Sequence, residues 1–290
     1  MADHPPLFAQ VNDLHHTYLR GTPLETVALK GVTMQIRAGE TVGIIGRTGA
    51  GKSTLVQHFN GLLRPRQPGR LIIEGQDMSD PTLDVRALRQ RVGLVFQRPE
   101  QQLFERLVGD DIAFGLKQLG LPADERRARV RWAMEQVGLD FDRFRNRFTF
   151  SLSGGEMRRV ALAGVLSLQP KVLILDEATS GIDPRGRREL LTRINQWHQQ
   201  SGATLIWVST NMDEIAELAE HIYVLDDGRV VLCGTPRQLF ADPVALRHYG
   251  LRAPQVSALA HRLKELGVIL PRVPITVAEA AEDVWTILSS

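Results

Sequence analysis

The chain has 290 residues, enough for one large domain with an appendage or for two modest domains. Its hydrophobic fraction of 43% and charged fraction of 23% are typical of a globular protein, and a formal net charge of +2 gives no support to binding a bulk polyanion such as nucleic acid. The single cysteine, Cys233, excludes an internal disulfide and fits a reducing compartment. No stretch approaches the ~20 apolar residues that a helix needs to cross a bilayer, so any membrane association is expected to be peripheral or through a partner.

Strand-like runs alternate with helical patterns along most of the chain, which predicts an α/β fold with parallel strands. The strand-like runs fall at residues 27–45, 70–75, 92–97, 171–177, 203–210 and 221–234. Residues 121–138 predict an amphipathic helix that begins near a proline and ends at a glycine. After about residue 240, a connection containing prolines leads to two short amphipathic helices, which are too small to fold alone and are expected to pack on the main domain or on a partner.

The stretch "GRTGAGKST" follows a predicted strand and precedes a predicted helix, with the spacing of a phosphate-binding loop. Its glycines let backbone N–H groups converge on phosphate oxygens, and the N-terminus of the next helix favours the same negative charge. Lys52 is expected to hold the β and γ phosphates of a nucleotide, and Ser53 to give an oxygen to Mg²⁺. The alternative is a tight turn with accidental spacing. The predicted nucleotide contacts are Gly46, Arg47, Thr48, Gly49, Ala50, Gly51, Lys52, Ser53 and Thr54.

Two acidic residues end the apolar stretch "VLILDE". Asp176 is placed to bind the Mg²⁺ shell, and Glu177 to orient or deprotonate the attacking water. Taken alone, the pattern could be an acidic cap at the start of a helix. The phosphate loop upstream favours metal binding and catalysis.

The pentapeptide "LSGGE", residues 152–156, on its own indicates only a serine cap followed by a glycine turn. The phosphate loop, this pentapeptide and "VLILDE" follow one another along the chain in that order. With all three motifs, the sequence resembles the ATP-binding cassette (ABC) ATPases over roughly residues 7–240. The resemblance implies a P-loop NTPase of the ABC ATPase fold, with a mixed sheet core, an antiparallel β subdomain and a helical subdomain at about residues 98–165. It divides the chain into an ATPase domain at residues 1–240 and a helical extension at residues 241–290.

The resemblance also implies site residues in two subunits. Tyr18 matches the aromatic residue that stacks on adenine, although a surface tyrosine at a strand end would look the same. Gln97 matches the glutamine that joins the Mg²⁺ shell and senses the membrane subunit. The residues implied to complete the nucleotide site of an opposite ATPase subunit are Ser153, Gly154, Gly155, Glu156 and Asp183.

Longer stretches resemble the energy-coupling factor subgroup, which imports vitamins and transition-metal ions, and most closely the second ATPase of its pair. They include "TPLETVALKGV", "QHFNGLLRP", "VGLVFQRPEQQLF" and "APQVSALAHRLKELGV". The implied partners are a second ATPase subunit, a transmembrane scaffold subunit and a small substrate-binding membrane subunit, with this chain on the cytoplasmic side of the cell membrane. Residues 97–104 are the expected docking surface, unless they only pack against the helical subdomain, and the extension is an expected dimer contact.

Thr210 departs from the family pattern. In ABC ATPases the strand after the catalytic glutamate ends in a histidine that contacts the γ-phosphate, and in "VSTNMDE" Thr210 stands at that position. Threonine is shorter and cannot carry positive charge, so slow hydrolysis is one expectation; an adequate contact through Thr210, Asn211 or a water is the other. A slow site would favour a paralogue over a second copy as the ATPase partner.

Other classes fit the sequence less well. A conventional ABC importer with a soluble substrate-binding protein is the nearest alternative, but the extension and the "TPLET" stretch argue against it. A non-transport ABC ATPase acting on the ribosome or DNA would be expected to carry tandem cassettes or a long coiled-coil insertion. A small P-loop kinase or GTPase would leave "LSGGE" unexplained. The transported substrate cannot be predicted, because in this subgroup another polypeptide determines it.

Overall fold

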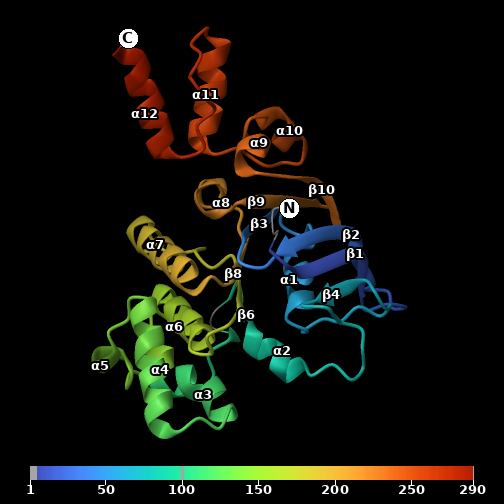
Figure 1. Ribbon diagram of the computed structural model, residues 1–290, viewed down its shortest axis with the longest axis vertical. Coiled ribbons are helices and arrows are strands. Elements are labelled where there is room, and N and C mark those ends of the chain that lie inside the picture. The colour runs from blue at the N-terminus through green and yellow to red at the C-terminus, as the bar shows by residue number, and fades with distance from the viewer. Residues whose placement is uncertain (1–4, 99–100, 290) are drawn as a thin grey trace. The chain divides into compact units, whose positions relative to one another are not determined.

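The computed structural model describes residues 5–98 and 101–289. These residues divide into two compact units, and Figure 1 labels most of their helices and strands. The first unit lies within residues 1–55, 64–81 and 207–290, and the second within residues 56–63 and 82–206. The helical extension therefore belongs to the same unit as the phosphate loop, and the domain boundary at residue 240 stays a prediction.

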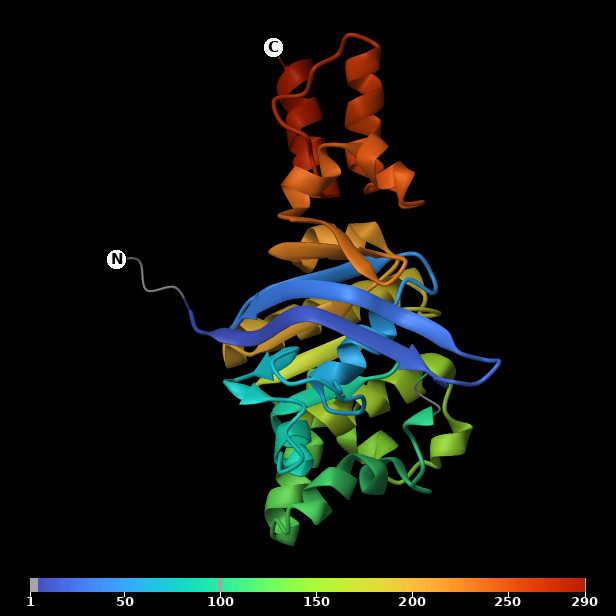
Figure 2. The same cartoon turned by 90° about the vertical axis from the view of Figure 1, so that its right-hand side faces the viewer.

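The first unit begins with a long antiparallel hairpin, whose two blue strands lie side by side in Figure 2. Val11 and Leu14 are fully buried, and a register shift between them interrupts the alternation of faces that a regular strand would show. Two short strands extend this sheet in the order β2-β1-β4-β5, and all three neighbouring pairs are antiparallel. The sheet matches the antiparallel β subdomain that the family resemblance implied. Its strands are β1 (Leu7–Tyr18), β2 (Thr26–Arg37), β4 (Leu71–Ile73) and β5 (Gln76–Asp77).

Three further strands of the first unit mix parallel and antiparallel pairing. They are β3 (Thr41–Gly46), β9 (His221–Asp226) and β10 (Arg229–Gly234). β3 pairs with β9 in parallel, and β9 pairs with β10 through a turn at residues 227 and 228, which both have positive φ as a tight hairpin turn requires. Every residue of β3 is buried, which explains its continuous apolar run. The strands predicted at residues 27–45 and 221–234 are confirmed.

The helices of the first unit lie mostly at its C-terminal end. The two helices predicted after residue 240 are α11 and α12, and a further helix, α10, lies within the stretch predicted as a connection. That helix forms because Asp242 accepts the N–H groups of Val244 and Ala245, each at 3.0 Å, while Pro243 occupies the first helical turn. The helices are α8 (Met212–Leu218), α9 (Pro236–Phe240), α10 (Pro243–His248), α11 (Gln255–Glu265) and α12 (Val277–Leu288). Helix α1 (Lys52–Phe59) begins in the first unit and ends in the second.

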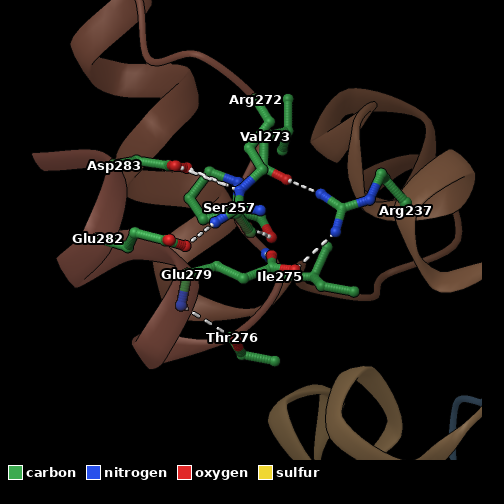
Figure 3. Close-up of polar contacts among 10 residues, drawn as sticks. Arg237, Ser257, Arg272, Val273, Ile275, Thr276, Glu279, Glu282 and Asp283 are labelled. Atoms are coloured by element: carbon green, nitrogen blue, oxygen red, sulfur yellow. Dashed lines mark hydrogen bonds and ion pairs between the residues drawn. The ribbon is translucent and has the colours of Figure 1, made fainter. Parts of the chain in front are cut away.

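Charged contacts join the parts of the helical extension (Figure 3). Arg272, between α11 and α12, lies 3.2 Å from the carboxylate of Asp283, which is 4% exposed. Arg237 in α9 donates to the backbone oxygen of Val273 at 2.9 Å and pairs with Glu279 at 2.6 Å. The extension is thus fastened to the body of its own unit, as expected for a segment too small to fold alone.

The second unit contains parallel strands and most of the remaining helices. β6 (Val92–Val95) and β7 (Val172–Asp176) pair in parallel, and β8 (Thr204–Val208) crosses the boundary between the units in the chain. The helix predicted at residues 121–138 is α4, which buries Val130, Ala133 and Met134. The helices are α2 (Val85–Arg91), α3 (Val108–Gln118), α4 (Ala123–Gln136), α5 (Phe141–Phe144), the 3₁₀ turn η2 (Thr149–Ser151), α6 (Gly154–Leu166) and α7 (Pro184–Ser201).

Strands in both pairing directions, interleaved with helices, agree with the predicted α/β class. Among the helices of the described residues, none has both the length and the apolar composition that a membrane crossing requires.

Candidate functional site

The phosphate loop predicted at residues 46–54 curls around the side chain of a lysine. Lys52 is 8% exposed, and its ammonium donates to the backbone oxygens of Gly46 at 2.7 Å and Arg47 at 3.0 Å. Gly51 has a φ of +101°, a conformation that glycine adopts readily, and a Cβ there would lie 2.6 Å from a backbone oxygen of β2. A loop that places a buried ammonium at the N-terminus of a helix fits an anion such as a nucleotide phosphate.

The side chain of Arg47 leaves this loop and lies against Gly250, just after α10. A Cβ on Gly250 would lie 2.9 Å from Cδ and 3.2 Å from Nε of Arg47. Gly250 has a φ of +67°, and its N–H donates to the backbone oxygen of Arg247 at 2.9 Å. The sequence did not predict this contact, because the two residues are far apart in the chain and a glycine gives no signal of what it touches.

Tyr18, the predicted adenine contact, lies beside the phosphate loop. Its hydroxyl is 3.2 Å from Oγ1 of Thr54, the last residue of the loop, and its ring meets the edge of His16 at a centroid distance of 4.5 Å. The ring is 37% exposed. The structure therefore brings Tyr18 and the phosphate loop together within the first unit.

Two of the three polar residues that follow β8 stabilise the start of α8. Ser209 Oγ donates to the carboxylate of Glu214 at 3.1 Å, and Glu214 is 3% exposed. Asn211 caps the helix by accepting the N–H of Asp213 at 3.0 Å, and its Nδ2 donates to Glu214 at 3.3 Å. Thr210, between them, is exposed. The side chain of Asn211 thus caps the helix, and Thr210 is the most exposed of the three residues.

Asp213 links α8 to the helical extension. Its Oδ1 accepts the backbone N–H of Gln255 at 3.3 Å. Gln255 is the first residue of α11, whose own N-cap residue, Pro254, makes no capping hydrogen bond. A carboxylate is favoured at the N-terminus of a helix, so Asp213 serves as the cap that α11 lacks.

The predicted acidic pair lies in the second unit, where β7 ends. Asp176 is 4% exposed and Glu177 is partly buried. Glu177 has a φ of +51°, which is uncommon for a residue with a side chain and costs on the order of 1–3 kcal/mol. The N–H of Ser180 donates to the carbonyl of Glu177 at 3.1 Å, so a tight turn follows at once. Backbone strain at this residue is characteristic of functional sites.

The residues of the "LSGGE" motif form the start of α6. Ser153 is its N-cap: Oγ accepts the N–H of Glu156 at 3.3 Å, and the Glu156 carboxylate accepts the N–H of Ser153 at 2.7 Å. Burial raises the pKa of Glu156, but the N–H of Ser153 and the guanidinium of Arg147, 2.8 Å away, outweigh burial and hold that pKa below its usual value. A Cβ on Gly154 or Gly155 would meet no atom within 4 Å. The serine does cap the helix, and space is open beside the first two helical residues.

Arg158, which the sequence analysis did not single out, connects two predicted site segments of the second unit. It is 8% exposed, and its guanidinium donates to the backbone oxygens of Ser180 and, at 3.3 Å, of Gln97. The side chain of Gln97 is exposed. Asp183 caps α7, and backbone N–H groups, that of Gly186 first, hold its pKa below the usual value. A basic pair directly after the motif was the only sequence signal for Arg158.

Comparisons with known proteins show which family the chain resembles. The family model described as "ABC transporter" matches residues 29–180. A protein of Symbiobacterium thermophilum, named energy-coupling factor transporter ATP-binding protein EcfA2, is 48% identical over 274 residues, which are 94% of each chain. The structure of cbiO1 from Clostridium perfringens, described as part of the ABC transporter complex cbiONQ, superposes with a TM-score of 0.73 at 36% identity, covering 90% of this chain and 99% of that chain.

A dimeric ATP-binding cassette, MJ0796 bound to ADP and Pi, superposes with a TM-score of 0.71 at 25% identity, covering 78% of this chain and 98% of that chain. Its fold is thus shared with the larger part of the present chain. The chain belongs to the ABC transporter family, and within that family to the energy-coupling factor transporter ATP-binding proteins. The predicted family and the predicted ABC ATPase fold are confirmed.

Proposed function

We propose that this chain binds ATP with Mg²⁺ and hydrolyses it as an ATP-binding subunit of an energy-coupling factor transporter that imports vitamins or transition-metal ions. The observation that carries the proposal is the phosphate loop, whose own carbonyls hold a buried ammonium at the start of α1. The relative from Symbiobacterium thermophilum supports the transport role, since each chain covers 94% of the other and its name is that of such a subunit.

The predicted binding residues suit ATP and Mg²⁺ chemically. Lys52 offers a positive charge to the β and γ phosphates, and Tyr18 offers an aromatic face to adenine. Ser53, Gln97 and the buried Asp176 offer the oxygen ligands that Mg²⁺ prefers. When bound, Mg²⁺ would neutralise charge on the phosphates.

Glu177 is the residue proposed to orient or deprotonate the attacking water. Its position at the end of a buried strand, with a strained backbone, supports a fixed carboxylate. The open space at the start of α6 supports a contact with nucleotide bound to another subunit. The residues proposed to make that contact are Ser153, Gly154, Gly155, Glu156 and Asp183.

Nucleotide binding to the full-length chain tests the first step of this proposal. Lys52→Ala should weaken ATP affinity by roughly 10²-fold, because a charge-assisted contact to phosphate is lost. Lys117→Ala is the matched control, since Lys117 is an exposed lysine paired with Asp110 at 2.9 Å. Equal affinities for the two variants would contradict the assignment of the phosphate loop.

The substitution at Thr210 supports an asymmetric pair of ATPase subunits. Thr210 is exposed and lacks the charge of the family's histidine, whereas Glu177, Lys52 and Ser153 are in place. We infer that the site built on this chain's phosphate loop hydrolyses ATP slowly, while its "LSGGE" motif serves a faster site on a paralogous partner.

Single-turnover hydrolysis in the assembled complex tests this asymmetry. Thr210→His is expected to accelerate the slow phase by roughly 10-fold or more, and Glu177→Gln to remove that phase. A rate unchanged by Thr210→His, together with a rate abolished by Glu177→Gln, would show that threonine is sufficient.

The proposed membrane partners are a transmembrane scaffold subunit and a small substrate-binding membrane subunit, with this chain held peripherally on the cytoplasmic side of the cell membrane. Docking is proposed at residues 97–104, of which residues 99 and 100 lie outside the described residues. Phe104 supports the proposal, since it is 58% exposed. A second ATPase subunit is proposed to contact the helical extension, which exposes large apolar side chains. The most exposed of those on α11, on α12 and between them include Leu259, Leu266, Ile269, Val277, Trp285 and Leu288.

A further inference from the structure

Two contacts join the helical extension to the two loops of the first unit that are proposed to face the phosphates of ATP. One is the packing of Arg47 on Gly250, and the other is the hydrogen bond from Gln255 to Asp213. We propose that the extension positions both loops for nucleotide, with Gly250 and Gln255 as positioning residues. This inference rests on the proposed function, and it gives the extension a role inside its own subunit besides any contact with a partner.

The first contact reaches the phosphate loop through Arg47. Gly250 ends α10 in the left-handed conformation, with its N–H bonded to Arg247 and the next N–H, of Leu251, bonded to the carbonyl of Leu246 at 3.0 Å. This turn fixes the surface on which the Arg47 side chain lies. The backbone oxygen of Arg47 in turn accepts a hydrogen bond from the Lys52 ammonium at 3.0 Å. Arg47 thus connects Gly250, which its side chain contacts, with Lys52, which bonds to its backbone oxygen.

The second contact reaches the loop after β8 through Asp213. Asp213 accepts the N–H of Gln255 through its side chain, and its own N–H donates to Asn211 at 3.0 Å. Asn211 is the neighbour of Thr210, the residue at the expected γ-phosphate position. Asp213 thus bonds to the start of α11 through its carboxylate and to the loop that carries Thr210 through its backbone N–H. Both contacts lie within a single unit of the fold.

Coupling of this kind is reciprocal. If the extension holds the loops in a conformation that favours nucleotide, then bound nucleotide stabilises the extension by the same factor. Coupling factors between sites are typically about 5–150-fold in affinity.

A pair of glycine variants tests the first contact in the full-length chain, with ATP affinity measured by equilibrium binding in the absence of turnover. Gly250→Ala would place a Cβ 2.9 Å from Arg47, whereas Gly267→Ala would meet nothing within 4 Å. Both glycines have positive φ, +67° and +86°, so both variants carry a similar backbone penalty. We expect Gly250→Ala to weaken ATP binding by about 5-fold or more and Gly267→Ala to leave it within about 2-fold.

The double variant shows whether Arg47 transmits the effect. In an Arg47→Ala background, Gly250→Ala should cause no further loss of affinity, because the side chain that it displaces is gone. Equal effects of the two glycine variants, or a full effect of Gly250→Ala without Arg47, would overturn the first contact.

A proline variant tests the second contact with little risk to the fold. Gln255→Pro removes the N–H that Asp213 accepts, at the first position of α11, where proline is tolerated. Ala123→Pro makes the same change at the first position of α4, where Ala123 is exposed and the N-cap residue is again a proline, Pro122. We expect Gln255→Pro to weaken ATP binding by about 5-fold and Ala123→Pro to leave it unchanged. Equal affinities would overturn the second contact.

Lys52→Ala distinguishes failure of the positioning role proposed for the extension from failure of the proposed function. If Lys52→Ala abolishes ATP binding while Gly250→Ala and Gln255→Pro have no effect, the extension does not position the loops and the proposed function stands. If wild type and Lys52→Ala bind ATP equally, the phosphate loop is not the nucleotide site and both proposals are wrong.

Discussion

Ser153 has two roles that removal of its hydroxyl can separate: it caps α6, and it is proposed to complete the nucleotide site of a partner ATPase. Ser153→Ala deletes the Oγ that accepts the N–H of Glu156 at 3.3 Å. Loss of an N-cap typically costs ~1 kcal/mol. Even if the free energy of unfolding is about 5 kcal/mol, about 4 kcal/mol remains, so roughly 99.9% of the molecules stay folded. Destabilisation alone therefore cannot lower activity measurably.

Thr235→Ala is the matched control for this prediction. Thr235 caps α9 with the same reciprocal pattern, and its Oγ1 accepts the N–H of Gln238 at the same distance, 3.3 Å. Both variants should lower the melting temperature of the chain by about 2–4 °C. In the assembled complex, Ser153→Ala should lower steady-state ATP hydrolysis by roughly 10²-fold, because a donor to the reacting phosphates is lost, and Thr235→Ala should not. Equal ATPase rates for the two variants would refute the role of Ser153 at the partner's site.

The pKa of Glu156 gives a prediction about acid stability. Because that pKa is held below its usual value of 4.5, the charged group stabilises the fold above about pH 4.5, and this stabilisation is lost as the pH falls through the lower folded pKa. Thermal melts of wild type and Glu156→Gln should converge in that range; a gap that stays constant down to pH 3 would contradict the ion pair with Arg147. For Tyr18, equilibrium binding should show that Tyr18→Ala weakens ATP affinity by about 10-fold through lost stacking. Tyr18→Phe, which loses only the 3.2 Å contact with Thr54, should stay within about 3-fold, and equal losses would show that the hydroxyl matters more than the ring.

The strands and the principal helix were predictable because each depends on a local pattern. β3 and β7 are continuous apolar runs that are buried along their whole length, and α4 repeats its apolar residues at the spacing of a helix. The phosphate loop was predictable for a similar reason, since the spacing of its glycines and Lys52 follows from the geometry of one short turn.

Contacts between distant parts of the chain were not predictable from these patterns. Arg158 reaches two carbonyls far from it in sequence, and the packing of Arg47 on Gly250 leaves no mark on either residue. The residues after β8 show a second reason why site residues are hard to predict from sequence. The sequence offered Asn211 as one possible contact to the γ-phosphate, but Ser209 and Asn211 hydrogen-bond within the first turn of α8. A side chain that a motif comparison would assign to the nucleotide can thus be occupied in capping a helix.

The most direct test of the transport role is a gentle detergent pull-down of this chain from membranes of its own host, followed by mass spectrometry of the subunits that accompany it. We predict recovery of a second, non-identical ATPase, a transmembrane scaffold protein and one or more small membrane proteins. Recovery of two conventional permease subunits would identify a different importer, and recovery only in the soluble fraction with ribosomes or DNA would contradict a role in transport.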